Sequence, residues 1–73
     1  MKTYVTFGQD HVHTIGLHTI DKDCVVVFDT PSAQAGRDKA FEFFGPTFCF
    51  EYSEDHWDES KMMKYFPRGY IEL

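Results

Sequence analysis

Residues 24–52 contain three consecutive elements and read CVVVFDTPSAQAGRDKAFEFFGPTFCFEY. The unbroken apolar run from Cys24 to Phe28 is typical of a core strand. The segment from Ser32 to Phe44 has apolar residues at helical spacing, and Gly45-Pro46 ends it. Residues 47–52 alternate, which predicts a second strand. The residues expected to share one face of this strand are Phe48, Phe50 and Tyr52. The rest of the chain is expected to pack around this strand, helix and strand.

The predicted helix has start and stop signals. Thr30 is the predicted N-cap, and Pro31 suits the first helical position because its missing N–H costs nothing there. Gly45 fits the left-handed position that follows a helix. The stripe expected to face the sheet consists of Ala33, Gly36, Ala40, Phe43 and Phe44, widened by Phe41. Gly36 on this stripe would let the helix approach the sheet closely.

The flanking segments predict further elements. Residues 2–7 alternate, which predicts a strand with one buried side. The residues expected on that side are Thr3, Val5 and Phe7. Residues 11–20 predict a hairpin or extended excursion that leads to the Cys24 strand. Ser53 is expected to cap a short helix that runs to Lys64 and carries Trp57, and residues 70–73 predict a last strand.

Together these elements predict one α+β domain that spans residues 1–73. We expect a mostly antiparallel sheet of about four strands, with the main helix packed on one face and a short second helix. A domain this short buries only about 60% of its unfolded surface. Its eight Phe, four Tyr and one Trp supply the large rings that such a small core needs.

The net charge of -5 disfavours direct binding of nucleic acid, because affinity for phosphates comes from Lys and Arg. It favours a partner with a basic surface, such as a protein that itself binds nucleic acid. The alternative is that mild acidity only keeps a small protein soluble. No apolar run approaches the ~20 residues of a membrane span and no secretory leader is visible, so we expect a cytoplasmic protein. Cys24 and Cys49 are then expected to be reduced thiols.

Four motifs along the chain carry a resemblance to known proteins. They are Thr6-Phe7-Gly8-Gln9 with His11, Arg37-x-x-Ala40-Phe41-x-x-Phe44-Gly45, Phe48-x-x-x-Tyr52-x-Glu54 and Tyr65-Phe66-Pro67-x-Gly69. In these motifs the chain resembles a widespread group of small bacteriophage and prophage proteins. The resemblance covers nearly the whole chain and departs from the group between His13 and Lys22. It implies a phage setting, in which small acidic proteins such as anti-CRISPR proteins interfere with host defence.

An acidic run surrounds the single tryptophan of the chain. Its predicted partner-binding residues are Glu51, Glu54, Asp55, Trp57, Asp58 and Glu59. Carboxylates beside an aromatic anchor could occupy a basic groove in the way that phosphates do. The alternative is a solvated surface whose Trp57 packs inward.

A second set of candidates would bind a small anionic ligand. Gln9 and His11 follow the first predicted strand, and Arg37 lies on the predicted helix. A guanidinium with amide and imidazole donors suits a nucleotide, so this alternative is a protein that sequesters a signalling nucleotide. The alternative is that Gln9 and His11 only form the turn after Gly8 and that Arg37 is a solvated helix residue.

A further alternative is a metal site. His11 and His13 are two residues apart, so in a strand both imidazoles would point the same way. A zinc site needs three or four ligands, and only two are secure here. No phosphate-binding loop, nucleophile elbow or Cys-x-x-Cys occurs, so we expect no catalytic residue and no cofactor.

These observations lead to one expected function. We expect a non-enzymatic inhibitor of a bacterial host defence system, acting in the host cytoplasm through its acidic surface. The expected partner is a host defence protein with a basic surface, such as a CRISPR effector.

Overall fold

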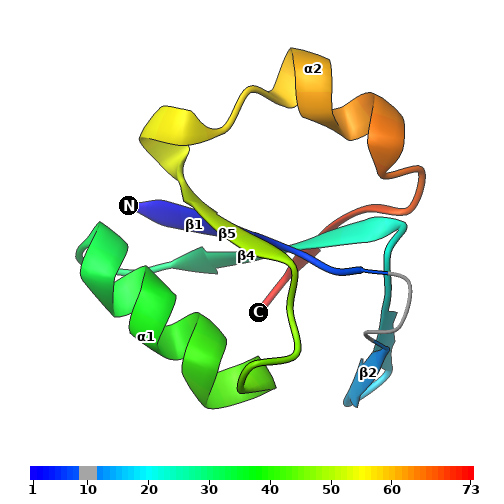
Figure 1. Cartoon of the computed structure of the whole chain (residues 1–73), viewed down its shortest axis with the longest axis horizontal. Helices are drawn as coiled ribbons and strands as arrows, with labels where there is room; N and C mark the ends of the chain where they lie inside the picture. The colour runs from blue at the N-terminus through cyan, green and yellow to red at the C-terminus, as the bar shows by residue number, and fades with distance from the viewer. Residues whose placement is uncertain (9–11) are drawn as a thin grey trace.

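In the part of the chain that the computed structural model describes, residues 1–8 and 12–73, four strands form one mixed sheet (Figure 1). The strands are β1 (Lys2–Thr6), β4 (Cys24–Asp29), β5 (Phe50–Ser53) and β6 (Gly69–Glu72). Their order across the sheet is β5-β1-β4-β6. The predicted α+β class is thereby confirmed.

The direction of β6 differs from the expected antiparallel arrangement. β1 is antiparallel to both β4 and β5, so β4 and β5 run in the same direction. The chain leaves β5 at one edge of the sheet, crosses a face, and enters β6 at the other edge, parallel to β4. The sheet is therefore mixed rather than mostly antiparallel, because this crossing brings β6 in along the direction of β4.

Helix α1 (Ala33–Phe44) starts two residues later than the predicted cap implies. Its N-cap is Ser32, whose Oγ accepts a hydrogen bond of 3.1 Å from the Ala35 N–H. The prediction of Thr30 as the cap is wrong, because its hydroxyl donates instead to the carbonyl oxygen of Ser32. The predicted stop is confirmed: Gly45 has a φ of 59° and its N–H donates to the Phe41 carbonyl oxygen.

The contact between α1 and β1 is very close at Gly36. A Cβ placed on this glycine would lie 1.8 Å from Thr3 Oγ1, and Thr3 is fully buried. The buried helix face is narrower than predicted, since it consists of Gly36, Ala40 and Phe44, whereas Phe41 and Phe43 stay partly exposed. Against this face pack Val5, Val26 and Phe28 of the sheet.

Strands β2 (His13–Ile15) and β3 (His18–Ile20) form a separate two-stranded sheet. This confirms the hairpin expected within residues 11–20, although residue 11 lies outside the described part. Gly16 has a φ of 59° at the first turn position, and Leu17 follows without a positive φ, as type II′ turns require. The arm is attached through Ile20, which is fully buried in the core.

The segment after β5 covers the face of the sheet opposite α1 (Figure 1). It contains two 3₁₀ turns, η1 (Glu54–His56) and η2 (Met63–Tyr65), around the short helix α2 (Glu59–Met62). The prediction of one helix capped by Ser53 is wrong. Trp57 has an extended backbone and Asp58 caps a new helical turn. The helix is interrupted because the Trp57 ring packs on Tyr4 of the sheet.

Phe48 also lies apart from its predicted face. The strand begins at Phe50, and Phe48 packs on the α1 side, with its ring 5.2 Å from that of Phe41. Phe48 is therefore not on the face of Phe50 and Tyr52. Within the described residues, no helix is both long and apolar enough to cross a bilayer.

The close approach at Gly36 gives a stability prediction. We expect Gly36→Ala to lower the free energy of unfolding by about 1–3 kcal/mol, because the new methyl group overlaps Thr3. This loss should outweigh the gain of roughly 1 kcal/mol in helix propensity. Urea denaturation measures it, and the loss should shrink in a Thr3→Ala background. A Gly36→Ala protein as stable as the parent would contradict the contact.

Candidate partner-binding surface

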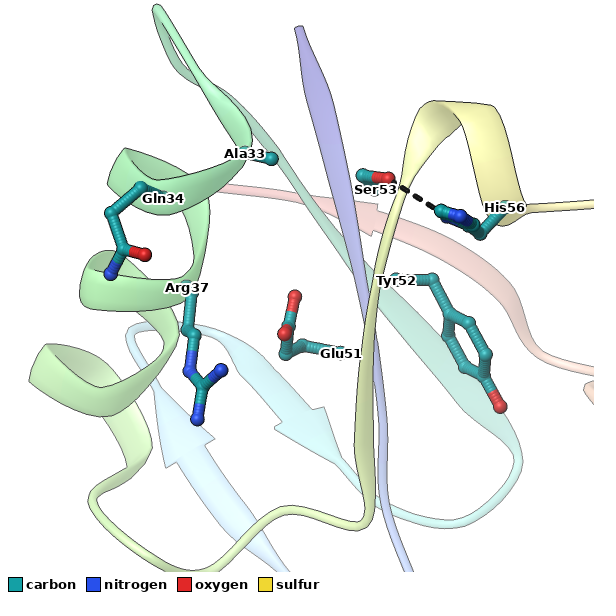
Figure 2. Close-up of a pocket in the computed structure, with 7 residues that line it drawn as sticks. All are labelled: Ala33, Gln34, Arg37, Glu51, Tyr52, Ser53 and His56. Atoms are coloured by element: carbon teal, nitrogen blue, oxygen red, sulfur yellow. Dashed lines mark hydrogen bonds between the residues drawn. The ribbon is translucent and has the colours of Figure 1, made fainter.

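The predicted acidic residues divide between the two faces of the sheet. Tyr4 of β1 pairs with Tyr52 of β5, and Val5 pairs with Glu51, so neighbouring residues of β5 point to opposite faces. Figure 2 shows Glu51 on the α1 side of β5 and Tyr52 on the other side. Glu51 is therefore separated from the predicted surface. The remaining set, Glu54, Asp55, Trp57, Asp58 and Glu59, is called the acid-rich segment below.

Trp57 fixes this segment to the sheet. Its ring stacks on that of Tyr4, with centroids 4.7 Å apart and planes within 4°. Its Nε1–H donates a hydrogen bond of 3.0 Å to the hydroxyl of Tyr70. The ring also lies 5.5 Å from Tyr52 and 6.2 Å from Phe66. Trp57 is half-buried, as its inward-packing alternative implies, and it works as a structural anchor.

The four acids of the segment are exposed at the surface. None of Glu54, Asp55, Asp58 and Glu59 forms an ion pair within 4 Å among the residues that the structure describes. Four uncompensated carboxylates within a rigidly mounted segment create a local negative field. This field is the property that a basic partner would recognise.

Asp58 also has a structural role. Its side chain accepts hydrogen bonds from the Ser60 hydroxyl at 2.7 Å and from the Lys61 N–H at 3.3 Å. The bond from Ser60 is the main cause that lowers the pKa of Asp58 below its ordinary value. Asp58 thus caps α2 as a carboxylate, and substitutions that test binding should leave it in place.

Arg37 lines a hollow of about 340 Å³ between α1 and β5. Figure 2 shows its guanidinium and the Glu51 carboxylate entering this hollow from opposite walls, with Gln34 and His56 at its borders. The other members of the predicted anion site, Gln9 and His11, lie outside the described residues. In this hollow the carboxylate of Glu51 opposes the field of Arg37, which disfavours an anionic ligand.

His13, the second residue of the predicted metal pair, makes a packing contact. Its Nε2 lies 2.8 Å from the carbonyl oxygen of Thr47, which can only accept, so this nitrogen donates a hydrogen bond there. Its ring packs edge-on against Phe7 and Phe44, which holds the β2–β3 arm against the end of α1. His11 lies outside the described residues. Among those described, no group of three or more His, Cys, Asp or Glu could hold a metal ion.

The two thiols differ in their surroundings. Cys24 is fully buried, and burial is the main cause that raises the pKa of its thiol. Cys49 is exposed, and both are free. A raised pKa reduces the thiolate fraction at neutral pH, so Cys24 has the surroundings of an inert core residue.

Trp57 is held in place by Tyr4 and Tyr70. Neither of these two residues belongs to the predicted site. A signal for Tyr4 was present, because it alternates with buried Thr3 and Val5 and so places a large ring on the supposedly outer face. A ring in the middle strand of a sheet requires a cover. The partner of Tyr4 could not be identified from spacing, since Trp57 is distant in the chain.

The hydrogen bond between Trp57 and Tyr70 gives a second prediction. We expect Tyr70→Phe to lower the free energy of unfolding by about 1 kcal/mol, because the indole N–H loses its acceptor. Urea denaturation followed by Trp57 emission measures this. Tyr52→Phe is the matched control, since it removes a hydroxyl from the same cluster without touching that N–H. Equal losses in both variants would contradict the assigned bond.

The ionisation of Tyr70 gives a third prediction. Burial is the largest cause that raises the pKa of Tyr70, and the nearby Glu59 carboxylate raises it further, while the bond from Trp57 acts in the opposite direction. The contribution of neutral Tyr70 to stability is therefore complete below the ordinary tyrosine pKa of about 10. It is lost as pH rises through the raised pKa.

Urea denaturation at a series of pH values from neutral to strongly alkaline tests this dependence. The stability difference between the parent protein and Tyr70→Phe should shrink as the pH rises past about 10. Parallel pH profiles for the two proteins would refute the role of Tyr70.

No protein-family model, no curated protein and no solved structure matches the chain.

Proposed function

We propose that the protein acts without catalysis, by binding a basic surface of a partner protein through the acid-rich segment. The observation that supports this is the exposed position of Glu54, Asp55, Asp58 and Glu59 without an ion pair in the described part of the chain. Attraction between such a surface and a basic groove speeds association and decreases as salt is added.

The mounting of the segment supports the same proposal. Binding orders flexible groups at a cost in free energy, and a preorganised surface avoids part of that cost. The Tyr4–Trp57 stack and the Asp58 cap hold the carboxylates before any partner arrives. The segment therefore offers a fixed pattern of negative charge rather than a flexible acidic tail.

The partner that fits best is a protein whose basic groove normally holds nucleic acid. Carboxylates on a rigid segment would occupy the positions of phosphates there. With the phage-type resemblance of the sequence, this makes a host defence protein, such as a CRISPR effector, the proposed target. The site of action would then be the host cytoplasm.

The fourth prediction tests this function by charge reversal. We expect Glu54→Lys with Asp55→Lys to abolish protection of an invading plasmid in bacteria that carry an active CRISPR system. The control variant Asp38→Lys with Glu42→Lys makes the same charge change on exposed positions of α1. It should keep full protection if the acid-rich segment is the contact surface.

Two outcomes would count against the proposal. Equal loss in both double variants would show that net charge, and not this surface, decides the effect. Full protection by the Glu54→Lys, Asp55→Lys variant would show that the acid-rich segment does not contact the partner. Thermal melts of all variants check that each protein remains folded.

A second candidate function, a small-nucleotide binder, is supported by the position of Arg37 at a hollow of about 340 Å³. A nucleotide present at 100 times its dissociation constant would stabilise the folded protein by about 2.7 kcal/mol. Thermal-shift measurements with cyclic and linear nucleotides test this, and Arg37→Gln should abolish the shift. A flat response to every nucleotide would argue against the candidate, as the carboxylate of Glu51 already does.

A further inference from the structure

A second hollow of about 340 Å³ lies on the opposite face of the sheet from α1. Its floor is Val27 of the central strand β4. Aromatic side chains of Tyr4, Trp57 and Tyr70 line it, together with the carboxylates of Glu59 and Glu72. Only Trp57 and Glu59 among these belong to the acid-rich segment, so the hollow extends the proposed surface onto the sheet.

The strand register explains why these residues meet. Tyr4 pairs with Val27, and Val27 pairs with Glu72, so one row across three strands places all of them on one face. Tyr70 lies two residues before Glu72 and points to the same side. Because Val27 is shorter than Tyr4 and Glu72, which flank it, the row has a depression at its centre. The crossing segment then adds Trp57 and Glu59 above it.

The aromatic walls are held in fixed positions. The ring of Tyr4 stacks on Trp57 at 4.7 Å and lies 5.8 Å from Tyr70, tilted by 53°. The rings of Trp57 and Tyr70 are 6.4 Å apart at 57°, and the Nε1–H to hydroxyl bond connects them. The electron-rich faces of tilted aromatic rings attract cations, most strongly where water is partly excluded.

The charges of the hollow favour the same kind of ligand. Two carboxylates, Glu59 and Glu72, stand against one ammonium group, that of Lys2. Within the described residues, Lys2 forms no ion pair with either of them at 4 Å or less. The hollow therefore has unneutralised negative charge beside aromatic rings, an arrangement that repels anions and attracts basic groups.

We propose that this hollow receives a single lysine or arginine side chain of the partner protein. The inference rests on the proposed function, in that it assumes a basic protein partner. It adds the point of insertion: the side-chain stem would lie against Tyr4 and Tyr70, and the charged head would reach Glu59 and Glu72. Lys2 at the border competes with the incoming cation.

Small cations test the hollow without a partner. Trp57 is the only tryptophan of the chain, so its emission reports on this hollow. We expect titration with N-acetyl-arginine amide or N-acetyl-lysine amide to change this emission in a saturable way, whereas the neutral analogue N-acetyl-citrulline amide should not. The stronger of the two cationic probes then identifies the preferred side chain.

Variants that remove negative charge from the hollow, and one that removes its positive charge, should change the affinity for the cationic probe in opposite directions. Glu59→Gln and Glu72→Gln should each weaken binding of the cationic probe by roughly three- to tenfold, and Lys2→Gln should strengthen it by a similar factor. The control Asp38→Asn with Glu42→Gln, on α1, should leave the affinity unchanged. Equal binding of the citrulline probe, or affinities that do not change in Glu72→Gln and Lys2→Gln, would overturn the proposal.

A lysine- and arginine-rich decapeptide separates this inference from the proposed function. If the decapeptide binds, if Glu54→Lys with Asp55→Lys weakens that binding, and if Glu72→Gln has no effect on it, the acidic surface is supported as the contact and the hollow is refuted. If Glu72→Gln weakens binding of both the decapeptide and the small probes, while the Glu54 and Asp55 reversals have no effect, the hollow is supported and contact through Glu54 and Asp55 is refuted.

Discussion

The stacking of Trp57 on Tyr4 is the contact on which the second layer of the protein depends. Tyr4 lies in β1, a central strand of the sheet, and its neighbour Thr3 points to the other face, where it meets Gly36 of α1. Two adjacent residues of one strand therefore position both layers. A sheet this small has little apolar area, so a close contact on each face matters: a glycine that admits the helix, and a ring that holds the crossing segment.

This arrangement connects the fold to the proposed surface. The crossing segment has only short helical pieces, and pieces of this length are not stable by themselves. Its conformation is set by Trp57, by the Tyr70 hydroxyl, and by Asp58 at the start of α2. The carboxylates gain their fixed spacing from contacts beneath them. The positions of the surface charges therefore depend on the aromatic packing below them.

Much of the fold could be predicted from residues 24–52, because its signals are local. The apolar run of β4, the helical spacing of α1 and the stop at Gly45 each depend on neighbouring residues alone. The parallel entry of β6 depends on where a long crossing ends, which no local pattern contains. The break at Trp57 has the same origin, since a distant ring in β1 overrides the helical preference of residues 53–64.

The candidate site was predictable to a similar extent. The exposed acids of residues 54–59 follow from composition, but Glu51 belongs to the other face because side chains alternate along β5. Tyr70 and Glu72 could not be assigned to the same hollow as Trp57 without the register of β4 and β6.

That register also makes β6 the strand that covers one edge of β4. On that side, Cys24, Val25, Val26 and Val27 pair with the four residues of β6. Separation of β6 from β4 would expose unpaired N–H and C=O groups along a strand of apolar side chains, and such an edge is a template for strand addition by another chain. Resistance of this protein to aggregation therefore depends on how firmly its last strand stays in place.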